Sequence, residues 1–335
     1  MKKELKFLFK GFLFCFIVIG CFVSCGKPKT KSLQIGFTTA INPDDPYYVF
    51  ATEFAKIVDK KSDGNIKIDV LAGGQLGQER EMFEGMQLGT VDMAIMTNAY
   101  ASNFVNASGV FDLPFIFKDS ETAAKILDGQ LGTNVLKEYE NKKVKALAWG
   151  EGGFRHLVTM NKGVRKPDDF KGLKIRCMET NTYIETYNSL KANAVPMAWS
   201  ETITGLQQKT IDGLDIPISV IYSNGFPEIA KYISLTGHFY SPLVMCMSLD
   251  TWDELDDSQK KIISEASLEA GKLCREHNQK VEKVLLDKME AQGMTIVRDV
   301  DIKAFQEVLG DFYMKQSSYI GGTYVSDLLK ELNNN

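Results

Sequence analysis

The sequence predicts an α/β protein of two lobes joined by a hinge, and three observations lead to this prediction. Strand-like and helix-like segments alternate along residues 33–217, an order that builds mostly parallel sheets covered by helices. The chain has 335 residues, more than a single hydrophobic core usually supports. A helical segment at about 258–292 would be roughly 50 Å long at 1.5 Å per residue. Because this exceeds the width of one lobe, we expect the helix to span both.

The first 24 residues are typical of a secretion signal. Lysines precede an apolar run over residues 12–23, which is shorter than the roughly 20 residues that cross a membrane. Small residues precede Cys25 and a polar stretch follows it, as at a bacterial lipoprotein processing site. We predict a lipoprotein signal peptide at 1–24, lipid attachment at Cys25 with Cys21 as the rival, and a tether at 25–31. An uncleaved anchor and a plain secretion signal are the alternatives.

Charge and cysteine content exclude several classes of protein. The formal net charge of −4 leaves no broad basic surface, so we do not expect a nucleic-acid partner. Beyond the signal, Cys177, Cys246 and Cys274 form an odd and widely spaced set. We therefore predict small buried thiols rather than a disulfide framework. We expect the mature chain to be a monomer whose only contact with a membrane is its lipid.

Lobe I is predicted over residues 32–152. Residues 33–37 alternate as a strand, a helix opened by Asp45 and Pro46 ends at Gly64, and residues 66–70 form a second strand. A helix at 79–88 and a buried strand at 91–96 follow. Ligands of such sheets lie beyond the carboxyl ends of strands. Thr38, Thr97 and Asn98 come directly after strands, so we predict them at a binding site.

Lobe II is predicted over residues 153–239. The second series has strands at 144–149, 156–160, 173–177 and 211–217, a loose turn at 150–153, and helices at 181–190 and 201–208. Residues 233–247 return toward lobe I, so about 240–270 join lobe I and part of 271–335 joins lobe II. The segment at 258–292 is either one helix or two that break near Gly271.

Two arginines stand out in a chain with few candidate catalytic residues. Arg155 follows a glycine-rich stretch, and Arg176 ends an alternating segment in which it faces away from Leu173 and Ile175. A guanidinium stays charged at any working pH and holds a carboxylate through two parallel hydrogen bonds. The 3 histidines share no metal-type spacing, and no nucleophile elbow, dinucleotide fingerprint or phosphate-binding loop is present. We predict a receptor for a small organic acid, without catalytic residues, metal or cofactor.

Short motifs in a particular order resemble one family. They lie at residues 74–77, 88–92, 112–115, 172–176 and 195–197. With them the chain resembles, over residues 33–329, the DctP-type solute-binding subunit of TRAP transporters, the tripartite ATP-independent periplasmic carriers. The resemblance implies a two-lobed periplasmic binding protein fold that closes around an organic-acid anion. It also implies delivery of that anion to the TRAP membrane subunits, which run on an ion gradient.

The resemblance further implies roles for single residues. Arg176 matches the family arginine that makes the main salt bridge to the ligand carboxylate, and Arg155 matches a second arginine that supports the carboxylate or a hydroxyl. Trp199 lies where the family has a phenylalanine packed on the ligand. Tyr240 matches a frequent contact position, and Gln75 in the first motif is included with the contacts.

The chain departs from the family next to its last expected strand. Ile216 stands where relatives have an asparagine that helps to hold the carboxylate. The neighbouring Asp215 either accepts a hydrogen bond from a ligand hydroxyl or only stabilises its turn. We expect a sugar acid or a similar hydroxylated monocarboxylate, then a C4-dicarboxylate, while Trp199 and Ile216 leave room for a more apolar acid. A binding protein of an ATP-driven importer or sensor system, and a secreted lyase on acidic sugars, remain open.

Overall fold

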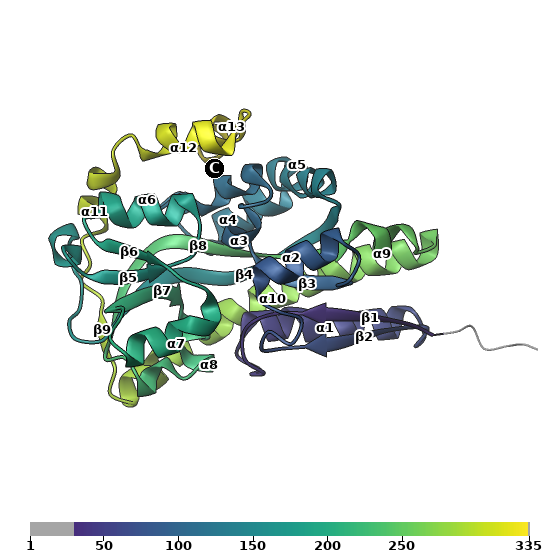
Figure 1. The fold of residues 1–335 in the computed structure, drawn as a ribbon, viewed down its shortest axis with the longest axis horizontal. Coiled ribbons are helices and arrows are strands. Elements are labelled where there is room, and N and C mark those ends of the chain that lie inside the picture. Colours follow the sequence, from purple (N-terminus) through teal and green to yellow (C-terminus); the bar gives the residue numbers. More distant parts are fainter. Residues whose placement is uncertain (1–29, 334–335) are drawn as a thin grey trace, which may run out of the picture.

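The computed structural model describes residues 30–333, and one continuous nine-stranded sheet forms its centre (Figure 1). The strand order is β2-β1-β3-β8-β4-β7-β5-β6, with β9 beside β8. The strands are β1 (Lys31–Gly36), β2 (Ile66–Leu71), β3 (Met93–Thr97), β4 (Val144–Thr159), β5 (Lys174–Cys177), β6 (Asn193–Pro196), β7 (Gly213–Pro217), β8 (Tyr232–Ser248) and β9 (Thr295–Val297).

The pairing directions divide this sheet into two lobes. Strand β1 pairs in parallel with β2 and β3 in lobe I, and β5 pairs in parallel with β6 and β7 in lobe II. Between these parallel parts the long strands β4 and β8 run antiparallel to each other and pair with strands of both lobes. The α/β class and the two-lobed fold predicted from the sequence are confirmed.

Helices cover both faces of the sheet. They are α1 (Pro46–Lys61), α2 (Glu79–Gln87), α3 (Asn98–Ala101), α4 (Ser120–Asp128), α5 (Gln130–Glu138), α6 (Asn181–Ser189), α7 (Trp199–Gln207), α8 (Ile218–Ser223), α9 (Leu249–Asp253), α10 (Asp257–Ala291), α11 (Ile302–Leu309), α12 (Phe312–Ile320) and α13 (Tyr324–Asn333). Short 3₁₀ helices lie at Asn106–Asp112, Tyr139–Lys142, Pro167–Phe170 and Phe226–Glu228. The sequence reasoning found the helices of the two αβ series and α10, and it missed α3–α5, α8, α9, α11–α13, β6 and β9.

Strand β4 corrects one prediction. The sequence reasoning divided this stretch into two strands with a loose turn at 150–153, but β4 is one strand of 16 residues. Its glycines allow close packing, since a Cβ on Gly150 would lie 2.7 Å from the ring of Phe50 in α1. A register shift against β8 occurs between Glu151 and Gly153, which is where the sequence predicted the boundary between lobes.

Helix α10 is a single helix of 35 residues, and it does not break at Gly271. The Asp256 side chain accepts a hydrogen bond from the N–H of Gln259 and caps its first turn. The helix contacts α1 in lobe I, β4 at the centre, and α8 in lobe II. It therefore spans both lobes, as predicted. Gly271 is explained by close approach, because a Cβ there would lie 2.3 Å from the carbonyl oxygen of Trp149.

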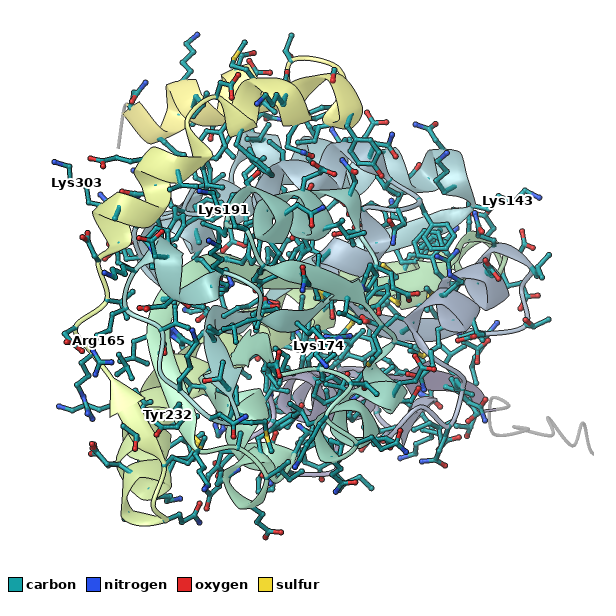
Figure 2. The ribbon with its side chains drawn as sticks, turned by 60° about the vertical axis from the view of Figure 1, so that its left-hand side comes forward. Lys143, Arg165, Lys174, Lys191, Tyr232 and Lys303 are labelled. Carbon is teal, nitrogen blue, oxygen red and sulfur yellow. The ribbon has the colours of Figure 1, made fainter. Side chains whose placement is uncertain are left out.

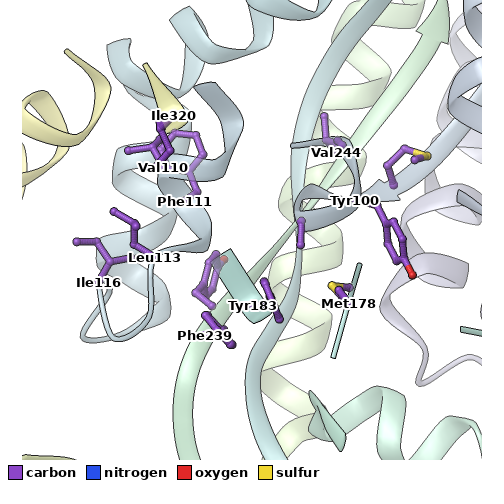
Figure 3. Packing of buried hydrophobic residues seen from close by; sticks show 14 of the residues in the cluster. Tyr100, Val110, Phe111, Leu113, Ile116, Met178, Tyr183, Phe239, Val244 and Ile320 are labelled. Atoms are coloured by element: carbon purple, nitrogen blue, oxygen red, sulfur yellow. The ribbon is translucent and has the colours of Figure 1, made fainter. Parts of the chain in front are cut away.

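Two apolar clusters fill the interior, one on each face of the sheet. In β3, Ala94 and Met96 belong to one cluster, and Met93 and Ile95 belong to the other, as alternation along a strand requires. The first cluster includes Tyr183 stacked on Phe239 with ring centroids 4.0 Å apart (Figure 3). Each cluster contains residues of both lobes, so the lobes share their cores across the central strands.

The cysteine prediction is confirmed, because Cys177, Cys246 and Cys274 are buried and unpaired. Burial raises the pKa of the Cys177 and Cys274 thiols to about 12. The predicted signal peptide, Cys21 and Cys25 lie outside the described residues. Within residues 30–333, none of the helices combines the length and the apolar character that a membrane crossing requires.

Candidate functional site

A cavity with an empty volume of about 360 Å³ lies between the lobes, next to the carboxyl ends of the parallel strands. Lobe I contributes Thr38, Thr39, Tyr47, Glu79, Thr97 and Tyr100. Lobe II contributes Arg155, Arg176, Met178, Trp199, Ile216, Pro217 and Val220. Of the predicted site residues, the cavity brings together Thr38, Thr97, Arg155, Arg176 and Trp199.

Arg176 is fixed by the backbone of its own lobe. It lies in β5 with its side chain 1% exposed, and both its Nε and Nη2 donate to the carbonyl oxygen of Met197, at 3.0 and 2.7 Å. A guanidinium has five N–H donors, so the Nη1–Nη2 edge remains available. Within residues 30–333 no carboxylate lies at ion-pair distance from it. Lys174, two residues earlier and labelled in Figure 2, instead donates to the carbonyl of Lys209.

Arg155 is fixed in the same way by the neighbouring strand. It lies in β4, and its Nε donates to Oδ2 of Asp215 at 2.5 Å, while its Nη2 donates to the carbonyl oxygen of Asp215 in β7. The guanidinium also lies 5.5 Å from the ring centroid of Tyr183. Again the Nη1–Nη2 edge is left without a protein partner in the part of the chain described. The two arginines thus offer the same edge to the cavity that they line.

The ion pair between Asp215 and Arg155 is fully buried. Burial is the largest single influence and acts to raise the pKa of Asp215, but the charge and hydrogen bond of Arg155, with smaller contributions from neighbouring groups, together outweigh it and hold that pKa below its usual value. His238 lies 4.0 Å from Asp215, and its ring nitrogens bond to the hydroxyls of Tyr187 and Thr236, each at 2.7 Å. Because burial lowers the pKa of His238 to about 4, the ring is neutral at physiological pH.

Glu79 is a cavity residue that the sequence reasoning missed. It is the first residue of α2, it is buried, and its Oε1 accepts from the backbone N–H of Thr97. Within the described chain no cationic group lies at ion-pair distance, and burial raises the pKa of Glu79 to about 7. An acidic residue directly after a strand–loop segment, in the first turn of a helix, is the signal that could have found it.

Hydroxyl groups of lobe I surround the same space. The Tyr47 hydroxyl lies 2.6 Å from the Thr97 hydroxyl, and Thr39 donates to Asp45 at 2.7 Å. At the mouth of the cavity the Tyr100 hydroxyl donates across the cleft to Glu179 of lobe II at 3.4 Å. The cavity is therefore cationic on its lobe II side and rich in hydroxyls on its lobe I side.

Four predicted contact residues do not line this cavity, and each has a protein partner instead. The Gln75 amide donates to the carbonyl of Ala72. Asn98 donates to Ser108 and Asp112, and the Tyr240 hydroxyl donates to Glu151. Asp215 accepts a hydrogen bond from Nε of Arg155. Ile216, the departure from the family pattern, does line the cavity.

No metal centre is formed by the described residues. Residues 30–333 contain no group of three or more His, Cys, Asp or Glu side chains placed to hold a metal ion. This includes the three histidines, His156, His238 and His277. His156 is also neutral at physiological pH, because burial lowers its pKa to about 3.

Comparisons with known proteins agree with this architecture. The model of bacterial extracellular solute-binding protein family 7 matches residues 37–318. A solute-binding protein of Verminephrobacter eiseniae is 36% identical over 278 residues, which cover 83% of this chain and 82% of that protein. Among solved structures, a TRAP periplasmic solute-binding protein from Polaromonas bound to D-erythronate is 34% identical, with a TM-score of 0.85, covering 89% of this chain and 98% of that one.

A second solved structure has a different sugar acid bound. The sugar acid binding protein DctPAm of Advenella mimigardefordensis, in complex with galactonate, has a TM-score of 0.88 at 27% identity and covers 91% of this chain and 99% of that chain. The family match and both structural matches span most of the chain. This chain therefore belongs to bacterial extracellular solute-binding protein family 7, the DctP-type solute-binding proteins of TRAP transporters.

Proposed function

We propose that this protein captures a sugar acid between its lobes and delivers it to the membrane subunits of a TRAP transporter. One observation carries the proposal: Arg176 and Arg155 line one cavity, and each is held by its Nε side with its Nη1–Nη2 edge unoccupied by any group within residues 30–333. That edge can bind both oxygens of a carboxylate. Erythronate and galactonate, bound by two similar proteins, are acids of this kind.

The remaining lining favours a ligand with hydroxyl groups. Thr38, Thr39, Tyr47 and Thr97 offer donors and acceptors opposite the arginines, and a buried polar group needs a partner. Trp199 and Ile216 supply apolar surface for the carbon chain. The cavity has two arginines, but Arg155 is already neutralised by Asp215. Of the two arginines that line the cavity, Arg176 alone is left to pair with a ligand carboxylate, which suits a monocarboxylate better than a dicarboxylate.

Closure is the proposed mechanism. The acid enters an open cleft, pairs with Arg176, and gains contacts to lobe I when the lobes close, so it favours the closed state. Closure excludes water and strengthens the ion pair. The protein then docks on the membrane subunits without chemical change to the ligand. This role makes the chain a receptor, like the rest of its family, and not an enzyme.

Calorimetry on arginine variants tests the proposal. A thermal-shift screen of erythronate, galactonate, gulonate and C4-dicarboxylates first identifies a binder, since a ligand at 100 times its dissociation constant adds about 2.7 kcal/mol of stability. Arg176→Ala should then abolish binding, and Arg176→Lys should weaken it severely because the fork geometry is lost. Lys174→Ala, on the same strand but outside the cavity, is the matched control. Near-normal affinity of Arg176→Ala would disprove the role of Arg176.

We also propose that the protein works outside the cytoplasmic membrane, anchored by lipid on Cys25. The periplasmic location of family members and the cysteine after the apolar N-terminal run support this proposal. Labelling of bacteria with palmitate should mark the wild-type protein and the Cys21→Ser variant, but not Cys25→Ser. Label that survives in Cys25→Ser and disappears in Cys21→Ser would assign the lipid to the rival cysteine.

A further inference from the structure

The charges around the cavity balance only when it is empty. Arg155 is neutralised by Asp215, so Arg176 and Glu79 are the remaining charged groups among the described residues that line it. If Glu79 is ionised, its charge and that of Arg176 cancel. A monocarboxylate that pairs with Arg176 adds one negative charge, and Glu79 would then be a buried carboxylate without a counter-charge.

A buried and uncompensated carboxylate is costly, and such a group usually takes up a proton instead. The position of Glu79 makes this response available. Glu79 lines the same cavity as both arginines, and it also lines the adjoining mouth. A protonated carboxyl group is a hydrogen-bond donor, whereas an ionised one only accepts. Protonation therefore removes the excess charge and provides a donor for the bound acid.

We propose that binding of the acid is coupled to the uptake of one proton by Glu79, whose neutral carboxyl group then donates a hydrogen bond to the ligand. The proton comes from solvent and is bound to a carboxylate oxygen of Glu79, and it returns to solvent when the ligand leaves. This inference rests on the proposed function, since it requires an anion in the cavity. It assigns Glu79 to the binding site as its acidic partner.

The groups that face Glu79 allow this proton uptake near neutral pH. Burial raises its pKa to about 7, while the positive charges of Arg176 and Arg155 act in the opposite direction. Tyr47 of α1 and Tyr100 of α3 are neutral, because burial raises the pKa of both hydroxyls. Arg80 and Glu81 of the same helix, and Glu179 from lobe II, lie at the mouth. Once the ligand neutralises Arg176, the pKa of Glu79 must rise further.

The sign of the pH dependence follows from this rise. Below about pH 7 Glu79 is already protonated in the free protein, so affinity should change little with pH. Above about pH 7 each binding event must take a proton from solvent, and affinity should fall by up to about tenfold per pH unit. The ligand carboxylate does not contribute, because a carboxylic acid stays ionised throughout this range.

Titration calorimetry in buffers of different ionisation enthalpy counts the protons directly. With the tightest binder among erythronate, galactonate and gulonate, the wild-type protein should take up close to one proton at about pH 8 and close to none at about pH 6. Glu79→Gln keeps a neutral donor at this position, so it should take up no proton at about pH 8 and lose the pH dependence. Glu84→Gln, at an exposed position of the same helix, should behave like wild type.

The outcomes separate this inference from the proposed function. Binding without proton uptake at about pH 8 would overturn the inference and leave the proposed function standing. Proton uptake that persists in Glu79→Gln would also overturn it, because another group would then carry the proton. If none of these acids binds to the wild-type protein, both proposals fail together. Proton uptake by wild type and Glu84→Gln, lost only in Glu79→Gln, confirms the inference.

Discussion

At the scale of single residues, the buried carboxyl groups of Asp215 and Glu79 show how a single charged neighbour affects the pKa of a buried acid. Asp215 touches the Arg155 guanidinium, and its pKa lies below the usual value in spite of complete burial. Glu79 has no such partner among the described residues, and burial raises its pKa to about 7. Asp215 is thus a fixed negative charge that holds an arginine, whereas Glu79 can respond to a ligand.

The first prediction concerns Asp215. Asp215→Ala leaves Arg155 as a buried charge without a partner, so it should reduce the free energy of unfolding by about 3–5 kcal/mol. Asp215→Asn keeps the shape but removes the charge and should also weaken ligand binding, because Arg155 is no longer held in place. Chemical denaturation and calorimetry measure the two effects. Asp212→Asn is the control, because the side chain of Asp212 accepts from the backbone N–H of Lys174.

The stability of the Asp215 ion pair should depend on pH in one direction. The pKa of Asp215 is lower in the folded protein than in the unfolded chain, so its contribution is complete above about pH 4 and is lost as pH falls below that value. The difference in unfolding free energy between wild type and Asp215→Asn should therefore shrink on acidification below about pH 4. A difference that stays constant down to about pH 2 would contradict the assignment.

At the scale of secondary-structure elements, the central crossings between the lobes depend on glycines. The ring of Phe50 packs closely against Gly150 in β4, and the carbonyl group of Trp149 packs closely against Gly271 in α10. The hydrogen bonds of Glu151 to Tyr240 in β8 and to Asn278 and Gln279 in α10 connect the three crossing elements at this level. These contacts make the region between the lobes a packed junction rather than a loose linker.

The second prediction tests this packing. Gly271→Ala places a Cβ 2.3 Å from the carbonyl oxygen of Trp149, a distance that forces α10 away from β4. Although alanine favours a helix more than glycine does, we expect a net loss of about 1–3 kcal/mol of stability. Thermal or chemical unfolding measures it, and Lys272→Ala at the adjacent exposed position should change stability by less than about 0.5 kcal/mol. A Gly271→Ala variant as stable as wild type would contradict the close packing.

Short sequence patterns, such as alternation and helix-start residues, predicted the elements that neighbouring residues specify. The alternation of Ile66–Leu71 and the helix opened by Pro46 are both found in the structure. The division of β4 was wrong because glycines at 150, 152 and 153 normally indicate a turn, and their actual cause, the approach of α1 and α10, is not visible in the sequence around them. Helices α11–α13 were missed, and none of the family motifs lies within these helices.

The same distinction holds for the site. Arg176 and Arg155 could be predicted, because a strand pattern, a glycine-rich segment and a family motif indicated both. Glu79 reaches the cavity only through the packing of α2 beside β3, and the partnership of Asp215 with Arg155 depends on the register of β7 against β4. Such contacts join residues that are distant in sequence, so one sequence without its structure could not assign them.

At the scale of the whole molecule, the lobes meet through hydrogen bonds that flank the cavity. On one side Asn103 of lobe I donates to the carbonyl oxygen of Glu179 in lobe II at 3.0 Å. On the other side Ser223 and Asn224 at the end of α8 donate to Asp45, the residue that caps α1. These bonds join the two lobes, so under the proposed closing mechanism they would stabilise the state that the ligand also favours.

The third prediction concerns one of these hydrogen bonds between the lobes. Asn103→Ala removes one hydrogen bond across the cleft, and Asn103 itself does not line the inner cavity. Affinity should therefore fall by about two- to tenfold, the effect of a bond worth about 0.5–1.5 kcal/mol. Asn106→Ala is the matched control, because its side chain bonds to Tyr319 and does not cross the cleft. Equal losses of affinity in both variants would argue against a role of this contact in closure.

A crystal structure of the complex with the acid found in the screen tests the central claim most directly. The account predicts a closed cavity in which both carboxylate oxygens lie within about 3 Å of Nη1 and Nη2 of Arg176, while its Nε still donates to Met197. A ligand bound with its carboxylate directed elsewhere, leaving that edge of Arg176 unoccupied, would contradict it.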